Sequence, residues 1–258
     1  MDNTPQAKKS LGQHWLTDAA ALQAMCDAAA VSWQDPVLEV GPGLGTLTAL
    51  LVQRVHEVVA VELDKRLAAE LPGRVPASNL QVETGSILEF DLTSLPVGYK
   101  VVANIPYYLT SNLIRTLSES SNPPSVAVLL VQKEVAERVA APPGKMSLLS
   151  VTAQFYWQVS LGREIPAQLF TPPPKVDSRI LILTRRPEAL FDVDTRRFFR
   201  LVKAGFSQRR KTLLNSLSAG LQIGRTEAEA LLKRSTIDPT ARPQELTLEQ
   251  WHALYKNT

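Results

Sequence analysis

Short apolar runs alternate with helical patterns over the first two-thirds of this chain. The runs predicted to be strands are Val37–Val40, Val58–Leu63, Leu80–Thr84, Val101–Ile105 and Val126–Val131. Helical patterns lie between them, at Leu47–Val55, Lys65–Leu71 and Ser111–Glu119. This alternation predicts a Rossmann-like α/β fold with parallel strands and helices on both faces of the sheet. Continuous apolar runs suit such a sheet, because both faces of each strand are covered.

The pattern changes in the last third of the chain. Gln154–Ser160 and Arg179–Thr184 are predicted to close the sheet as an antiparallel hairpin. Beyond a shift in composition near residues 185–187, only helices are expected, at Thr195–Ala204, Arg209–Gly220, Thr226–Arg234 and Thr247–Lys256. Thr226 with Glu229, and Thr247 with Gln250, have the spacing of capping boxes. We therefore expect an α/β domain over residues 1–186 and a small helical domain over residues 187–258.

The composition limits the class of protein. The chain has 258 residues, of which 45% are hydrophobic and 21% charged, a balance typical of a globular protein with a substantial core. No apolar run approaches the roughly 20 residues of a membrane-spanning helix, and Met1–Ser10 lacks the apolar core of a secretion signal. A soluble, cytoplasmic protein with no membrane partner is expected. The single Cys26 is interpreted as a small core residue.

A glycine-rich segment, Gly41-Pro42-Gly43-Leu44-Gly45, follows the first predicted strand and precedes a helical pattern. Glycines there let the backbone turn sharply and approach a ligand closely. The spacing differs from that of dinucleotide and triphosphate loops, and no lysine follows to hold a triphosphate. A ligand-binding loop and a purely structural turn both fit this segment.

The end of the second predicted strand reads Ala60-Val61-Glu62-Leu63-Asp64. A carboxylate at this place can accept hydrogen bonds from both ribose hydroxyls of a nucleoside. NAD would satisfy Glu62 as well as any other nucleoside cofactor would, so the residue indicates a ligand class and leaves the reaction open.

The end of the fourth predicted strand and the residues after it read Asn104-Ile105-Pro106-Tyr107-Tyr108. Ligands of open parallel sheets bind beyond the carboxyl ends of the strands, so Asn104 is expected to face the same crevice as Gly41 and Glu62. The exocyclic amine of adenine is a poor nucleophile because its lone pair is delocalised into the ring. The Asn104 side-chain carbonyl and a backbone carbonyl fixed by Pro106 would accept its protons and favour a pyramidal nitrogen, while Tyr107 would stack on the base. The alternative is a strand that ends at a proline, with tyrosines in the core.

Positive charge is concentrated in one segment. The formal net charge is only +3, but residues 196–215 contain seven lysines and arginines and neither Asp nor Glu. If residues 196–217 formed one helix, an apolar face and an adjacent basic face would result. The basic residues proposed to bind RNA phosphates are Arg200, Lys203, Arg209, Arg210 and Lys211. A solvated helix face is the alternative interpretation.

Taken together, several ordered motifs resemble those of the ribosomal RNA adenine dimethyltransferase family, in particular its small-subunit branch. They are 8–16 (KKSLGQHWL), 41–45, 104–107, 132–138 (QKEVAER), 170–178 (FTPPPKVDS) and 206–213 (FSQRRKTL). The resemblance implies an S-adenosylmethionine-dependent enzyme that forms N6,N6-dimethyladenosine at two adjacent adenosines near the 3′ end of 16S rRNA. It also implies that the partner is this rRNA, in the small ribosomal subunit or its precursor, and we expect the enzyme to be a monomer.

The resemblance also assigns residues. It implies a pocket for S-adenosylmethionine built from His14, Leu16, Gly41, Gly43, Glu62, Ser86 and Asn104. It implies catalytic roles for Asn104, Pro106, Tyr107 and Phe170, with Phe170 opposite Tyr107 across the target adenine. His14 stands where the family commonly has Asn, and Ser86 where it commonly has an Asp that accepts a bond from the cofactor's adenine amine. Met146-Ser147 replaces a usual Tyr-Gly.

Three other functions remain open at this point. They are a large-subunit rRNA adenine methyltransferase, a ribosome-assembly factor whose catalysis is secondary, and an NAD-dependent oxidoreductase. The helical tail after Arg225, with 238–243 (DPTARP), is more similar to the small-subunit enzymes. No metal site is expected, because His14, His56 and His252 are far apart in the sequence and no cysteine cluster accompanies them.

Overall fold

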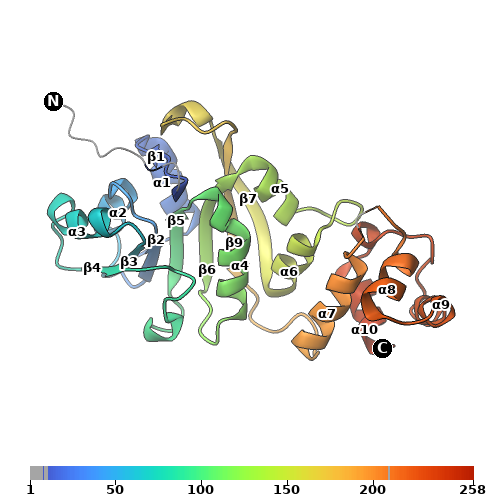
Figure 1. The fold of residues 1–258 in the computed structure, drawn as a ribbon. Helices are drawn as coiled ribbons and strands as arrows, with labels where there is room; N and C mark the ends of the chain where they lie inside the picture. Colours follow the sequence, from blue (N-terminus) through green and yellow to red (C-terminus); the bar gives the residue numbers. More distant parts are fainter. Residues whose placement is uncertain (1–7, 9–10, 209) are drawn as a thin grey trace. The chain divides into compact units, whose positions relative to one another are not determined.

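The computed structural model describes residue 8, residues 11–208 and residues 210–258. The chain forms two compact units (Figure 1). The first contains the described residues up to Ala136 together with Gln158–Arg185, and the second contains Glu137–Trp157 and Arg186–Thr258. The boundary between Arg185 and Arg186 lies one residue before the expected boundary, which was between residues 186 and 187. Residues 137–157, which the sequence pattern placed in the α/β domain, group with the helical unit instead.

The first unit is built on a seven-stranded sheet in the order β4-β3-β2-β5-β6-β9-β7 (Figure 1). Its strands are β2 (Pro36–Val40), β3 (Glu57–Glu62), β4 (Leu80–Thr84), β5 (Lys100–Asn104), β6 (Val126–Gln132), β7 (Trp157–Ile165) and β9 (Ser178–Arg185). The first five are parallel, and β9 runs antiparallel to β6. The predicted parallel sheet with two late strands at one edge is therefore confirmed.

The helices of the first unit follow the strands. They are α1 (Ala19–Ala28), α2 (Thr46–Leu51), α3 (Lys65–Arg74), α4 (Thr110–Glu119) and α5 (Lys133–Val139), the last of which crosses into the second unit. Asp18 caps α1 by accepting a hydrogen bond from the Ala21 amide, and Asp64 caps α3 through the Arg66 amide. Such caps satisfy amides that have no partner within the helix.

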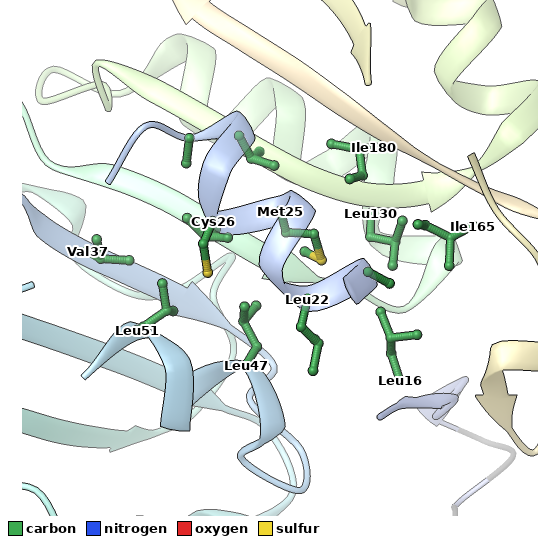
Figure 2. Packing of buried hydrophobic residues seen from close by; sticks show 14 of the residues in the cluster. Leu16, Leu22, Met25, Cys26, Val37, Leu47, Leu51, Leu130, Ile165 and Ile180 are labelled. Atoms are coloured by element: carbon green, nitrogen blue, oxygen red, sulfur yellow. The ribbon is translucent and has the colours of Figure 1, made fainter. Parts of the chain in front are cut away.

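The largest core of this unit lies between α1, α2 and one face of the sheet (Figure 2). Met25 and Cys26 of α1 are completely buried against side chains of β2 and β6, such as Val37 and Leu130. Cys26 is the small core residue that the sequence predicted, and burial raises the pKa of its thiol to about 11. The β6 side chains on the opposite face of the sheet, such as Leu129, are fully buried too. This is expected when helices cover both faces of a sheet.

One predicted strand is wrong over its first half. Residues 154–156 belong to α6 (Leu148–Tyr156), and β7 begins only at Trp157. Ser147 starts this helix with a capping box, in which its hydroxyl accepts from the Ser150 amide. Phe155 of this helix belongs to the core of the second unit, where it packs against Phe198.

The helical unit also contains α7 (Thr195–Gly205), α8 (Leu213–Leu221), α9 (Arg225–Arg234) and α10 (Leu248–Lys256). The two helices expected at Thr195–Ala204 and Arg209–Gly220 correspond to α7 and α8, although α8 starts only at Leu213. The projection of residues 196–217 as one helix therefore does not hold. Gly205 is buried, and a Cβ there would come within 2.4 Å of the Trp251 ring. The Thr247–Gln250 capping box is present, whereas α9 begins after Gly224 and makes no box at Thr226.

Candidate active site

A pocket in the first unit lies where the carboxyl ends of β2, β3 and β5 and the segment after β4 converge. All ten residues proposed from the sequence as catalytic or cofactor-binding line it. They are His14, Leu16, Gly41, Gly43, Glu62, Ser86, Asn104, Pro106, Tyr107 and Phe170. The rule that ligands bind beyond the strand ends of a parallel sheet therefore located the pocket correctly.

The glycine segment forms one wall of the pocket. Gly41 and Gly43 have positive φ angles of 67° and 57°, a conformation that favours glycine. A Cβ on Gly43 would lie 2.7 Å from the Trp15 ring, so that position has no room for a side chain. The Gly41 amide donates to the Val61 carbonyl at 2.9 Å, which ties the loop to the end of β3.

Glu62 is 6% exposed and is held by backbone amides. One carboxylate oxygen accepts from the Gly43 amide at 3.0 Å, and the other accepts from the Asp64 amide at 2.8 Å. Burial raises the pKa of Glu62, and these hydrogen bonds oppose the rise. Each carboxylate oxygen has a second lone pair, so the group retains the capacity to accept hydrogen bonds from a ligand.

Glu39, in β2, is a pocket-lining acid that sequence reasoning missed. It is 1% exposed, and its Oε2 atom has no hydrogen-bond partner among the described residues. Burial raises the pKa of Glu39 to about 8, an effect that the Thr48 hydroxyl opposes and the Glu62 carboxylate increases. An acid within an apolar strand was the available signal, since buried charges are rare unless they are paired.

Asn104 ends β5, and its side chain is oriented by the chain that precedes α1. Its Nδ2 donates to the His14 carbonyl at 3.4 Å, so the NH2 end of the amide faces the backbone of His14. The His14 ring is anchored separately, because its Nδ1 lies 2.7 Å from the Pro172 carbonyl. Both contacts join segments that are distant in the sequence.

Tyr107 begins a short 3-10 turn, Tyr107–Leu109, directly after Pro106. Its hydroxyl lies 2.8 Å from that of Ser178, a completely buried residue at the start of β9. Burial raises the pKa of Tyr107. The His14 and Tyr107 rings are nearly parallel, with centroids 6.0 Å apart.

Phe170 is placed by a second, two-stranded sheet. Strand β1 (Trp15–Leu16) pairs antiparallel with β8 (Phe170–Thr171), with Leu16 opposite Phe170. Phe170 lines the pocket but is only 2% exposed and also belongs to the main core. Ser86 lies on another wall, and its hydroxyl accepts from the Leu88 amide at 3.3 Å.

The basic segment of the helical unit is exposed. Arg200 and Lys203 project from α7, and Arg210 and Lys211 lie in the connection to α8; all four are exposed. The opposite side of α7 packs into the core of its unit through the buried Phe198 and Val202. Arg209, also proposed from the sequence, lies outside the described residues.

Two features are absent from the residues that the structure describes. No group of three or more histidine, cysteine, aspartate or glutamate side chains is arranged to hold a metal ion. Among the helices of the same residues, none has the length and apolar character needed to cross a membrane.

The chain is similar to known proteins along nearly its whole length. Residues 4–258 match the family model described as ribosomal RNA adenine dimethylase. A ribosomal RNA small subunit methyltransferase A from Dehalococcoides mccartyi is 40% identical over 97% of this chain and 88% of its own length. The enzyme of that name from Lactococcus lactis is 39% identical, over 96% and 88%.

Two solved structures are similar along nearly the whole chain. A dimethyladenosine transferase from Plasmodium falciparum superposes with a TM-score of 0.79 at 26% identity, covering 93% of this chain and 96% of that one. The 23S rRNA methyltransferase ErmE superposes with a TM-score of 0.75 at 28% identity, covering 94% and 98%.

Fold and pocket together define a Rossmann-like methyltransferase that uses S-adenosylmethionine. The chain belongs to the ribosomal RNA adenine dimethylase family.

Proposed function

We propose that this protein transfers methyl groups from S-adenosylmethionine to the N6 amines of two adjacent adenosines near the 3′ end of 16S rRNA, forming N6,N6-dimethyladenosine. The observation that carries the proposal is the placement of Asn104, Pro106 and Tyr107 in one pocket with Gly41 and Glu62. This pocket combines the polar groups expected around a nucleoside cofactor with those expected around an adenine amine.

The pocket's residues suit S-adenosylmethionine, which supplies a methyl group on a positively charged sulfur. Glu62 would accept hydrogen bonds from the ribose hydroxyls, because the lone pairs of a carboxylate outnumber the backbone amides that donate to it. The unpartnered Oε2 of Glu39 would accept from a cationic amine, which would offset the cost of its burial. Gly41 leaves the loop backbone open to a close approach, and His14, Leu16, Gly43 and Ser86 would complete the pocket.

Asn104 would hold the adenine amine. Since its Nδ2 donates to the His14 carbonyl, its Oδ1 is the atom left to accept a proton of the amine. The backbone carbonyl before Pro106 would accept the second proton, and the two bonds would favour a pyramidal nitrogen. A separate general base is not required, because the amine proton becomes acidic once the nitrogen is alkylated.

Tyr107 and Phe170 would position the base. The bond between the Tyr107 and Ser178 hydroxyls restricts rotation of the phenol ring, so the ring would present a fixed face to an extruded adenine. Phe170 is buried at the pocket wall and would contact the base from another side.

The helical unit would bind the rRNA backbone through Arg200, Lys203, Arg210, Lys211 and, as the sequence suggests, Arg209. Exposed cations on one segment attract phosphates without reading sequence. The small ribosomal subunit or its precursor is the proposed partner, because relatives about 40% identical are named for that subunit. We propose that the protein acts as a monomer in the cytoplasm, because its proposed substrate is a ribosomal subunit.

A large-subunit target is the second candidate, favoured by the similarity to ErmE over 94% of the chain. The deciding experiment supplies labelled S-adenosylmethionine with purified small subunits that lack the modification, or with large subunits. We expect label in the small-subunit rRNA only. Label in large-subunit rRNA would support the second candidate. Assembly rescued fully by an Asn104→Ala variant that transfers no methyl would favour the role of an assembly factor.

A further inference from the structure

Among the large hydrophobic side chains, Tyr108 is unusual in its exposure and position. It is 61% exposed, although most aromatic residues of this chain are partly or fully buried. It lines the mouth of the same pocket as Asn104 and Tyr107. Within the described residues its ring stacks on no other ring, and its hydroxyl has no hydrogen-bond partner.

The backbone around Tyr108 holds this exposed ring in place. Tyr108 is the middle residue of the 3-10 turn, which is closed when the Leu109 amide donates to the Pro106 carbonyl at 3.0 Å. The ring edge also rests on Gly12, because Cδ1 and Cε1 lie 3.5 Å from the place of a Cβ on that glycine. Gly12 has a φ of 62°. A supported aromatic ring facing solvent is a typical platform for a nucleic-acid base.

Because Tyr108 lies beside Tyr107, its position indicates which RNA base it would contact. Tyr107 and Tyr108 are consecutive, and both line the pocket, but Tyr107 is half-buried and tied to Ser178 whereas Tyr108 is exposed. When one adenosine enters the pocket, the nucleotide linked to it stays at the mouth. We propose that Tyr108 stacks on this neighbouring base and thereby holds the second adenosine of the pair while the first is methylated.

This inference rests on the proposed function, because it needs an RNA strand at the pocket. It assigns Tyr108 a role in binding RNA, separate from the contacts of the cofactor. Stacking of a base on an aromatic side chain is worth about 1–3 kcal/mol, which corresponds to roughly 5- to 150-fold in affinity. Loss of the ring should therefore raise KM for the RNA and leave kcat and the affinity for S-adenosylmethionine nearly unchanged.

The test compares Tyr108→Ala and Tyr108→Phe with the wild-type protein. Trp33→Ala is a matched control, because Trp33 is 62% exposed and does not line the pocket. The substrate is the small subunit with a ligated synthetic 3′ segment, in which the nucleotide next to the target adenosine is either adenosine or an abasic residue. Methyl transfer gives KM and kcat, and calorimetry gives the affinity for S-adenosylmethionine.

We expect Tyr108→Ala to raise KM about tenfold on the intact RNA, whereas Tyr108→Phe and Trp33→Ala stay near wild type. The abasic residue should raise KM for the wild type by a similar factor and add nothing for Tyr108→Ala, since both changes remove the same contact. Equal KM values for wild type and Tyr108→Ala, or fully additive effects, would overturn this inference alone. No transfer by the wild type to either substrate would instead overturn the proposed function.

Discussion

The hydroxyls of Tyr107 and Ser178 lie 2.8 Å apart and link the turn after β5 to the first residue of β9. Ser178 is completely buried, so water cannot replace it as the partner of Tyr107 without a rearrangement. The Tyr107 ring is therefore oriented by a residue that does not itself line the pocket.

This bond predicts that Ser178→Ala lowers the rate of methyl transfer. Removing one partner of a buried hydrogen bond costs about 1–3 kcal/mol, and here part of that cost should appear as a misplaced ring. We expect a fall of about tenfold in kcat/KM for the RNA, with rescue by Ser178→Thr, which keeps the hydroxyl. Tyr107→Phe serves as the second arm of a double-mutant cycle. If the losses in the two single variants simply add in the double variant, the hydroxyl pair does not position the ring.

Glu62→Gln should weaken binding of S-adenosylmethionine. An amide cannot accept from both the Gly43 and Asp64 amides and from ribose hydroxyls, because one of its two ends is a donor. Loss of one charge-assisted hydrogen bond is worth about 1.5–3 kcal/mol, or roughly 10- to 150-fold in affinity. The control is Glu83→Gln on the neighbouring strand β4, which does not line the pocket. Calorimetry that gives the same affinity for both variants would remove Glu62 from the ribose site.

The raised pKa of Glu39 should make the folding stability depend on pH. Its pKa rises from 4.5 to about 8 in the folded protein, so between these values the folded state holds a proton that the unfolded state has lost. Its contribution to stability is therefore greatest below pH 4.5 and falls as pH rises toward 8, by at most roughly 1.4 kcal/mol per pH unit.

A Glu39→Gln variant lacks this titration. The difference in free energy of unfolding between the variant and the wild type should shift in favour of the variant as pH rises from 5 to 8. Denaturant titration without cofactor measures it. Parallel stability curves for the two proteins would mean that Glu39 is ionised at its buried position.

The basic segment predicts a salt effect. If Arg210 and Lys211 each neutralise one phosphate, replacing both by alanine should make the slope of log affinity against log salt shallower by about one to two units. The control replaces the exposed Lys233 and Arg234 at the end of α9, which removes the same charge from the same unit. An unchanged slope for the first variant, or an equal change in the control, would mean that residues 210–211 do not contact the RNA directly.

The pocket could be predicted from sequence because its residues follow strand ends. Gly41, Glu62 and Asn104 each come at or just after the end of a parallel strand, and such ends meet at one edge of the sheet. Glu39 was missed because it lies within the strand rather than after it. The pairing of Leu16 with Phe170 joins residues too far apart in the chain for any local pattern to reveal.

Local patterns failed where tertiary packing overrode them. Residues 154–157 are rich in aromatic side chains and resemble a strand, but Phe155 belongs to a helix that the Ser147 cap initiates. Two helices were expected between Thr195 and Gly220, and both are present, but α8 starts only at Leu213, and α7 ends where Gly205 packs against Trp251. Propensity is a weak guide when a whole core decides which elements form.

Mass analysis of 16S rRNA from unmodified small subunits, after incubation with the protein and S-adenosylmethionine, is the most direct test of the proposed activity. We expect N6,N6-dimethyladenosine at both adjacent adenosines near the 3′ end. Asn104→Ala, folded by circular dichroism, should be slower by about 10²–10³-fold, since it loses a hydrogen bond that strengthens in the transition state. Unmodified adenosines with the wild-type protein, or modification by Asn104→Ala at the wild-type rate, would contradict the account.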